Sequence, residues 1–205
     1  MKSASTKRSP LALAILVLLY EAPMHTYGMR QQIKRRGEDE IVNVSQPNSL
    51  YQTIARLGRS GLIVAASKGQ QKHRPERTIY ELTSAGRLTM IEWTRKLLST
   101  PSREFPEFPA AISVLPILTP KDASKQLELR SEALEAELTR LHERLAAMAF
   151  VPRLFRLEVE FLHAQVTAEL RWVSAFIDDL RTGSLTWNKA SVRRAIKELV
   201  QKECG

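Results

Sequence analysis

The sequence is poor in cysteine, glycine and aromatic residues, and each scarcity narrows the class of protein. Its 205 residues include one cysteine, Cys204, so a disulfide within the chain and a cysteine-based zinc site are both excluded. Glycine occurs 8 times and aromatic residues make up 6% of the chain, whereas 43% of the residues are apolar. This composition predicts one or two globular domains with a proper core.

An apolar run long enough to cross a bilayer is also missing. Residues 11–20 are all apolar and follow three basic residues, as in a signal peptide. Ten residues cannot span a membrane, however, and residues 21–23 lack the small-x-small pattern of a cleavage site. We therefore interpret the run as a buried first helix, with Ser9 as its N-cap and Pro10 at its first position. The sequence predicts a cytoplasmic protein without a membrane partner.

Motifs for catalysis and cofactor binding are missing as well. The histidines His25, His73, His142 and His163 are scattered without the spacing of metal ligands. There is no glycine-rich phosphate loop, no nucleophile elbow and no carboxylate pair with a partner that would set its pKa. The sequence therefore predicts a protein that is not an enzyme and that needs neither a metal nor a cofactor.

Excess positive charge is confined to the first half of the chain. The whole chain carries a net charge of +9, from 31 basic and 22 acidic side chains. Residues 1–98 hold 16 basic and 7 acidic side chains, whereas residues 99–205 hold 15 of each. Because double-stranded DNA carries one phosphate per roughly 1.7 Å of its axis, this distribution favours DNA as the partner over a membrane or an acidic protein.

The basic half contains a short helix with one apolar and one polar stripe. Leu50, Ile54 and Leu57 recur at i, i+4 and i+7, so they can face a core. We expect the other stripe to contact base edges in the major groove of DNA. Its members are Ser49, Gln52, Thr53 and Arg56.

Two strand-like runs follow the helix and complete the layout of a winged helix. Gly61 ends the helix, and the runs cover residues 62–67 and 77–82. The loop between them is basic, and we expect it to reach DNA phosphates or the minor groove. The wing residues assigned to DNA contact are Lys72, His73, Arg74 and Arg77.

Two tyrosines and a basic helix end are further candidates for phosphate contact. The hydroxyl groups of Tyr27 and Tyr51 can donate to phosphates. For Tyr51, a core position with its hydroxyl in water is nearly as good an account. Arg30, Lys34 and residues 35–36 can contact phosphates or can simply complement a helix dipole.

A proline-rich segment divides the chain. Five of the ten prolines fall within residues 99–120, interleaved with apolar side chains, so we expect this connector to pack, with a short helix near residues 110–115. The predicted domains are a winged helix-turn-helix DNA-binding domain, the connector, a helical dimerisation domain and a tail that is either an extra helix or mobile. Their bounds are residues 1–98, 99–120, 121–186 and 187–205.

The C-terminal half predicts two long helices that form an antiparallel coiled coil. Thr119 and Pro120 open the first helix, Pro152 ends the run, and Gly183 closes the second helix. Two helices of roughly 30 residues cannot bury both apolar seams alone, so we expect a homodimer. The heptad residues assigned to its interface are Leu127, Leu134, Leu138, Leu141, Leu145, Val159, Leu162, Val166, Val173 and Leu180. Glu169 interrupts one seam and is interpreted as a surface position.

Three short segments are specific as a set: HTYG at residues 25–28, QPNSLYQTIARL at 46–57 and YELTSAG at 80–86. With these segments the first 98 residues resemble the PadR family of bacterial transcriptional regulators, and the C-terminal half resembles its branch with a long helical dimerisation domain. Asn48 stands where family members often have glycine. The resemblance implies a homodimer that binds a near-palindromic operator, usually as a repressor, and releases it when a small molecule or other signal arrives.

Four aromatic residues are candidates for an effector site. A flat, aromatic effector could bind among them at the dimer interface, although core or interface packing accounts for them as well. They are Trp93, Phe105, Phe108 and Trp172.

Two other classes of protein fit the same sequence. One is a different family of dimeric winged-helix regulators, which the long coiled coil after the wing argues against. The other is a coiled-coil adaptor whose basic N-terminal domain binds an acidic protein or a membrane surface. In an adaptor, the polar stripe of the short helix would have no role.

Overall fold

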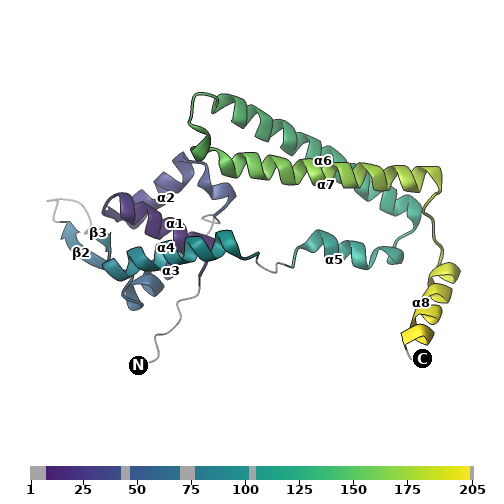
Figure 1. Cartoon of the computed structure of the whole chain (residues 1–205), viewed down its shortest axis with the longest axis horizontal. Helices are drawn as coiled ribbons and strands as arrows, with labels where there is room; N and C mark the ends of the chain where they lie inside the picture. The colour runs from purple at the N-terminus through teal and green to yellow at the C-terminus, as the bar shows by residue number, and fades with distance from the viewer. Residues whose placement is uncertain (1–7, 43–46, 70–76, 102–104, 204–205) are drawn as a thin grey trace. The chain divides into compact units, whose positions relative to one another are not determined.

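The computed structural model describes residues 8–42, 47–69, 77–101 and 105–203, which are mainly helical (Figure 1). Contacts between Cα atoms divide the chain into two compact units, Met1–Glu104 and Phe105–Gly205. The elements of the first unit are α1 (Pro10–Glu21), β1 (Met24–His25), α2 (Thr26–Arg35), η1 (Glu38–Glu40), α3 (Pro47–Arg59), β2 (Ile63–Gly69), β3 (Arg77–Leu82) and α4 (Ser84–Ser99).

Helix α1 is the central helix of the first unit. Ser9 Oγ accepts a hydrogen bond from Ala12 N at 3.2 Å, and Pro10 takes the first helical position, as the sequence predicts. The helix packs against α2, α3, α4 and β3, so half of its twelve residues are buried. The apolar run at residues 11–20 is therefore a core helix, and no helix in the described part of the chain is long and apolar enough to cross a membrane.

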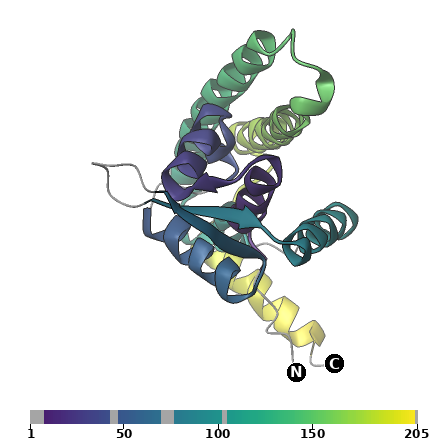
Figure 2. The same ribbon diagram turned by 90° about the vertical axis from the view of Figure 1, so that its left-hand side faces the viewer.

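The sheet has three antiparallel strands in the order β1-β3-β2. Strands β2 and β3 confirm the predicted wing, although β2 begins at Ile63 and continues to Gly69. The edge strand β1 was not predicted, because two residues are too short for a recognisable alternation; Met24 pairs with Tyr80 and His25 with Ile79. Figure 2 shows the strands beside α3, which contacts β2.

The start of α4 is fixed to the start of β2. Thr83 is the N-cap of α4: its hydroxyl accepts from Gly86 N at 3.0 Å and donates to the Gly61 carbonyl oxygen at 2.7 Å. Its backbone N–H donates to the Leu62 carbonyl oxygen at 3.1 Å. A Cβ atom on Gly86 would lie 2.0 Å from that same oxygen, so only glycine fits this position.

The second unit is helical. Its elements are α5 (Glu107–Ser113), η2 (Leu115–Ile117), α6 (Pro120–Ala147), η3 (Arg153–Phe155), α7 (Leu157–Thr182) and α8 (Lys189–Glu203). Thr119 caps α6 by accepting from Asp122 N at 3.2 Å, and Gly183 ends α7 with a φ of 75°. These two boundaries confirm the sequence prediction. Of the two alternatives left open for the tail, the structure has the extra helix, α8.

Helices α6 and α7 form an antiparallel hairpin (Figure 1). The predicted heptad seam lies between them, with Leu127, Leu141, Val159 and Val173 buried within one chain. The other six seam residues are half-buried. For the four buried residues the assignment to a dimer interface needs correction, because α6 and α7 cover them within one chain. For the six half-buried residues it remains a prediction.

Glu169 is an interhelical ion-pair partner rather than a plain surface residue. Its Oε1 accepts from Arg130 Nε at 2.7 Å and also from Arg130 Nη2. The guanidinium of Arg130 lies 3.5 Å from the ring centre of Phe108, which comes from α5. The connector is thereby packed on the hairpin, as its apolar composition predicts. Trp187 adds a second tie, donating from Nε1 to the Leu118 carbonyl oxygen at 2.8 Å.

Candidate nucleic-acid interface

Helix α3 presents a polar face to solvent. Its apolar residues Leu50, Ile54 and Leu57 are buried in the core of the first unit, as predicted. Successive residues of a helix are about 100° apart, so the face opposite these three is centred near position 52. The exposed residues of that face are Asn48, Tyr51, Gln52, Ala55 and Arg59.

This face differs from the stripe predicted from the sequence at two positions. Thr53 is only 6% exposed, and its hydroxyl donates to the Ser49 carbonyl oxygen at 2.8 Å, so it cannot contact DNA bases. Arg56 is half-buried, and its Nη2 lies 3.4 Å from Ser9 Oγ at the start of α1. The predicted stripe included positions at the edge of the apolar face, and for this reason Thr53 and Arg56 turn toward the core.

Arg59 and Asn48 are the residues that the sequence interpretation missed. Both are exposed on the same face as Gln52. A helical projection centred on the three buried residues would have identified both of them, because they lie about 180° and 150° from the middle of the apolar stripe. Ser49 is half-buried at the edge of this face.

Both candidate tyrosines are exposed. Tyr51 is 60% exposed, so the alternative of a core position does not apply. Tyr27, in the first turn of α2, is 56% exposed, and its hydroxyl accepts from Gln31 Nε2 at 3.0 Å. The preceding His25 caps α2 by accepting from Gly28 N at 2.9 Å, which explains why the HTYG segment opens this helix.

The basic residues at the end of α2 have different roles. Arg36 Nη1 donates to Glu21 Oε1 at 2.8 Å, and this bond holds the pKa of the Glu21 carboxyl below its usual range. The same bond raises the pKa of Arg36. Arg36 is therefore used to tie α2 to the end of α1, whereas Lys34 and Arg35 are exposed and available to a polyanion.

The wing loop lies outside the described residues. This applies to Lys72, His73 and Arg74, so their assignment to DNA contact remains a prediction. Arg77 is the first residue of β3, where it pairs with Gly69 across the wing. The strands therefore place the two ends of the basic loop side by side.

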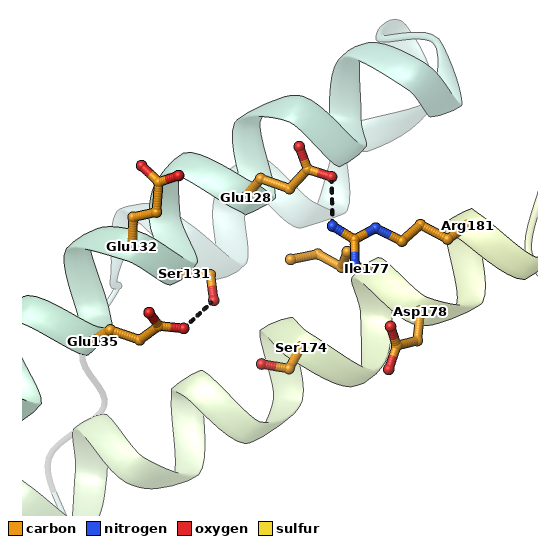
Figure 3. A pocket seen from close by; sticks show the side chains of 8 residues that line it. All are labelled: Glu128, Ser131, Glu132, Glu135, Ser174, Ile177, Asp178 and Arg181. Carbon is orange, nitrogen blue, oxygen red and sulfur yellow. Dashed lines mark hydrogen bonds and ion pairs between the residues drawn. The ribbon is translucent and has the colours of Figure 1, made fainter.

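The second unit carries an acidic hollow, whose charge has the same sign as that of DNA. A hollow of about 340 Å³ between α6 and α7 is lined by Glu128, Glu132, Glu135 and Asp178 (Figure 3). The one basic residue among its lining residues, Arg181, donates from Nη2 to Glu128 Oε1 at 3.1 Å. Because this hollow repels phosphates, the charges favour the first unit as the DNA-binding part.

The four aromatic residues suggested for an effector are divided between the two units: Trp93 belongs to the first, and Phe105, Phe108 and Trp172 belong to the second. Trp93 packs against the core of the first unit. In the second unit, Phe108 contacts Trp172 edge to face, with ring centres 6.0 Å apart, and Trp172 contacts Phe176. Phe105 is 83% exposed. The structure thus joins Phe108 and Trp172 and adds Phe176, which the sequence interpretation did not include.

Helices α1 to α3, the three-stranded sheet and the exposed polar face of α3 define a winged-helix domain. The model of the transcriptional regulator PadR-like family matches residues 15–92. The first unit therefore carries a PadR-like domain, and the resemblance found for the first 98 residues is confirmed. No match to a curated protein was found.

Solved structures of regulators resemble the chain over most of its length. Bacillus subtilis PadR in complex with operator DNA is 19% identical, with a TM-score of 0.67 over 84% of this chain and 99% of that chain. PadR in complex with p-coumaric acid is 20% identical, with a TM-score of 0.66 over 83% and 98%. The Vibrio cholerae virulence activator AphA is 18% identical, with a TM-score of 0.62 over 84% and 98%. The chain thus has the fold of these regulators.

Proposed function

We propose that this chain is a dimeric DNA-binding transcriptional regulator that represses its target, binds a near-palindromic operator and is released by a small effector. The observation that carries the proposal is the exposed polar face of α3 on a basic winged-helix unit. A structure with the same fold, that of PadR, holds operator DNA. The activity is binding rather than catalysis, and its site of action is DNA in the cytoplasm.

The exposed face supplies the groups that direct base recognition requires. The side-chain amides of Gln52 and Asn48 can each form two hydrogen bonds with adenine, and the guanidinium of Arg59 can form hydrogen bonds with guanine. Tyr51, Tyr27, Lys34 and the wing cations are suited to phosphates, which set affinity but not sequence. This division assigns specificity to α3 and salt-dependent affinity to α2 and the wing.

The dimer is proposed to form through a second apolar stripe on α7, on the side that α6 leaves uncovered. Leu157, Phe161, Ala164, Ala168 and Ala175 are exposed and follow the 4,3,4,7 spacing of a heptad seam. Phe161 is large and the alanines are small, so two such helices can approach closely around it. A second copy supplies the matching surface by symmetry.

A gel-shift experiment tests the proposed function. The duplex upstream of the chain's own gene is titrated with protein, against random duplex as competitor. A regulator shifts the upstream duplex at concentrations at least about 1,000-fold below those needed for random duplex, the lower end of specificity ratios for such proteins. Equal affinity for both duplexes would instead support the alternative of an adaptor with a basic surface.

Gln52→Ala is expected to weaken operator binding by about 1–3 kcal/mol and to leave binding to random duplex unchanged, because a base-edge contact depends on sequence. Thr53→Val is the matched control, because Thr53 is buried and the valine side chain has nearly the same shape as that of threonine. Its operator affinity should stay within about twofold of the original protein's. Equal losses for both variants, measured by fluorescence anisotropy, would show that the reading face is not the one we assign.

Lys72→Ala and Arg74→Ala are expected to weaken binding to operator and random duplex alike. Each lost phosphate contact should make the slope of log affinity against log salt concentration shallower by about 0.9. Salt titrations of both variants on both duplexes measure this slope. A loss of affinity confined to the operator would show that these residues recognise bases and do not contact phosphates.

A further inference from the structure

An apolar cavity of about 340 Å³ lies within the second unit, between the connector and the helical hairpin. Ala123 and Leu127 of α6 line it and are almost fully buried. Phe176 of α7 contributes another wall, and Ile112 and Leu115 come from the connector. Its size is within the range of about 300–1,000 Å³ that is typical of small-molecule sites.

The connector covers this cavity without filling it. No residue of α5 or η2 is buried, and Ile117, which lines the cavity, is 80% exposed. A cavity of this size under two short, poorly buried helices therefore leaves apolar surface available to a ligand.

Charges at the cavity define the chemistry of its occupant. Arg130 is the one charged residue among those that line it. Its guanidinium is paired with Glu169 and lies 3.5 Å from the ring centre of Phe108. An anion entering the cavity would have to compete with the Glu169 carboxylate, and a cation would face Arg130. Burying an unpaired charge is costly, so the cavity favours a neutral molecule.

We propose that this cavity binds a neutral, flat, largely apolar molecule, and that it is the effector site of the regulator. The assignment rests on the function proposed above. Of the four aromatic candidates it keeps Phe108, which lines the cavity, and leaves out Trp93, Phe105 and Trp172. The connector joins the two units of the chain, since α5 begins just after the division at residues 104 and 105. A ligand that holds α5 and η2 in place therefore acts on the segment that links the DNA-binding unit to the hairpin.

The binding test compares two probes with the same ring system. Full-length protein is titrated by calorimetry with 2-naphthalenemethanol, which is neutral, and with 2-naphthoate, which is an anion. The neutral probe should bind at least about tenfold more tightly, because only the anion has to compete with Glu169 for Arg130. Binding of neither probe, or tighter binding of 2-naphthoate, would overturn the proposal.

Two phenylalanine substitutions on α5 locate the bound probe. Ala110 and Ala111 are both exposed on α5, but only Ala111 lines the cavity. Ala111→Phe adds a ring to the cavity wall and should weaken 2-naphthalenemethanol at least about tenfold, while Ala110→Phe should change its Kd by less than about twofold. Equal Kd values for the two variants would place the probe elsewhere and overturn the proposal.

Glu169→Gln tests the role of the ion pair and separates this proposal from the proposed function. Without the carboxylate, Arg130 has an unneutralised charge, so 2-naphthoate should gain at least about tenfold in affinity. An unchanged preference for the neutral probe would contradict the charge argument. Calorimetry is done without DNA, so it tests the cavity independently of the proposed function. Absence of probe binding with an intact gel shift rejects only the proposal that the cavity binds a ligand. Probe binding without a gel shift rejects only the proposal that the chain is a DNA-binding regulator.

Discussion

Phe161→Glu combined with Ala168→Glu should give a folded monomer that binds the operator roughly 100-fold more weakly than the dimer. Both residues are exposed on the outer stripe of α7, so in the monomer the new carboxylates face water and cost little stability. In the dimer the same carboxylates would be buried against a second apolar stripe without partners. The charge therefore acts on assembly rather than on folding.

In the proposed dimer each copy reads one half-site, so operator binding should depend on dimerisation. Two linked recognition helices bind with an avidity that exceeds either one by a factor of about 100 to 10,000. A monomer retains contact with a single half-site and loses this factor. Light scattering measures the mass of the variant, circular dichroism its helix content, and anisotropy its affinity for the operator.

Thr167→Glu combined with Ser174→Glu is the matched control. It adds the same two charges, seven residues apart on the same exposed helix, but on another face. This control should remain a dimer with operator affinity close to that of the original protein. If both double variants are dimers, the interface lies on a different surface; if both are monomers, added charge alone separates the copies.

Leu141→Asp distinguishes the outer stripe from the seam within the hairpin. Leu141 is fully buried between α6 and α7, so an aspartate there has no route to water. The expected result is loss of helix content, not a folded monomer. This is why the heptad residues, although correctly predicted to be apolar contacts, are unsuited to a test of dimerisation.

The spacing of apolar residues predicted the two long helices, but it did not predict which helix packs against each apolar face. The cap at Thr119 and the terminator Gly183 are local signals, and both mark the observed helix ends. A heptad repeat shows only that a face is covered by another helix, and it does not say whether that helix belongs to the same chain. For this reason the hairpin seam was predicted as a dimer interface.

The candidate DNA-binding face shows the same limit on a smaller scale. The apolar residues of α3 were placed correctly, since three of them at i, i+4 and i+7 define a stripe. Polarity alone then put Thr53 on the exposed side, although threonine can satisfy its hydroxyl on the carbonyl four residues earlier and turn inward. The cavity under α5 depends on how two short helices cover the hairpin, and no sequence pattern specifies that packing.

Gly86→Ala is expected to destabilise the first unit by roughly 3 kcal/mol or more, within the range of severe backbone and packing substitutions. The new Cβ would lie 2.0 Å from the Leu62 carbonyl oxygen and 2.7 Å from Leu82 Cδ1, so the backbone between α3 and β2 has to move. That oxygen also accepts from the backbone N–H and the hydroxyl of Thr83. One methyl group therefore disturbs the N-cap of α4 and the start of the wing together.

Gly58→Ala is the control for this prediction, because Gly58 lies within α3 and a Cβ there meets nothing within 4 Å. Alanine in an open helical position should raise the free energy of unfolding by about 0.5–1 kcal/mol. Thermal unfolding followed by circular dichroism should show Gly86→Ala lowering Tm by roughly 10 °C or more, with Gly58→Ala shifting it slightly upward. Equal Tm values for the two variants would mean that α4 does not approach β2 as closely as the structure shows. The wing would then lack the rigid attachment that our assignment of its cations to DNA requires.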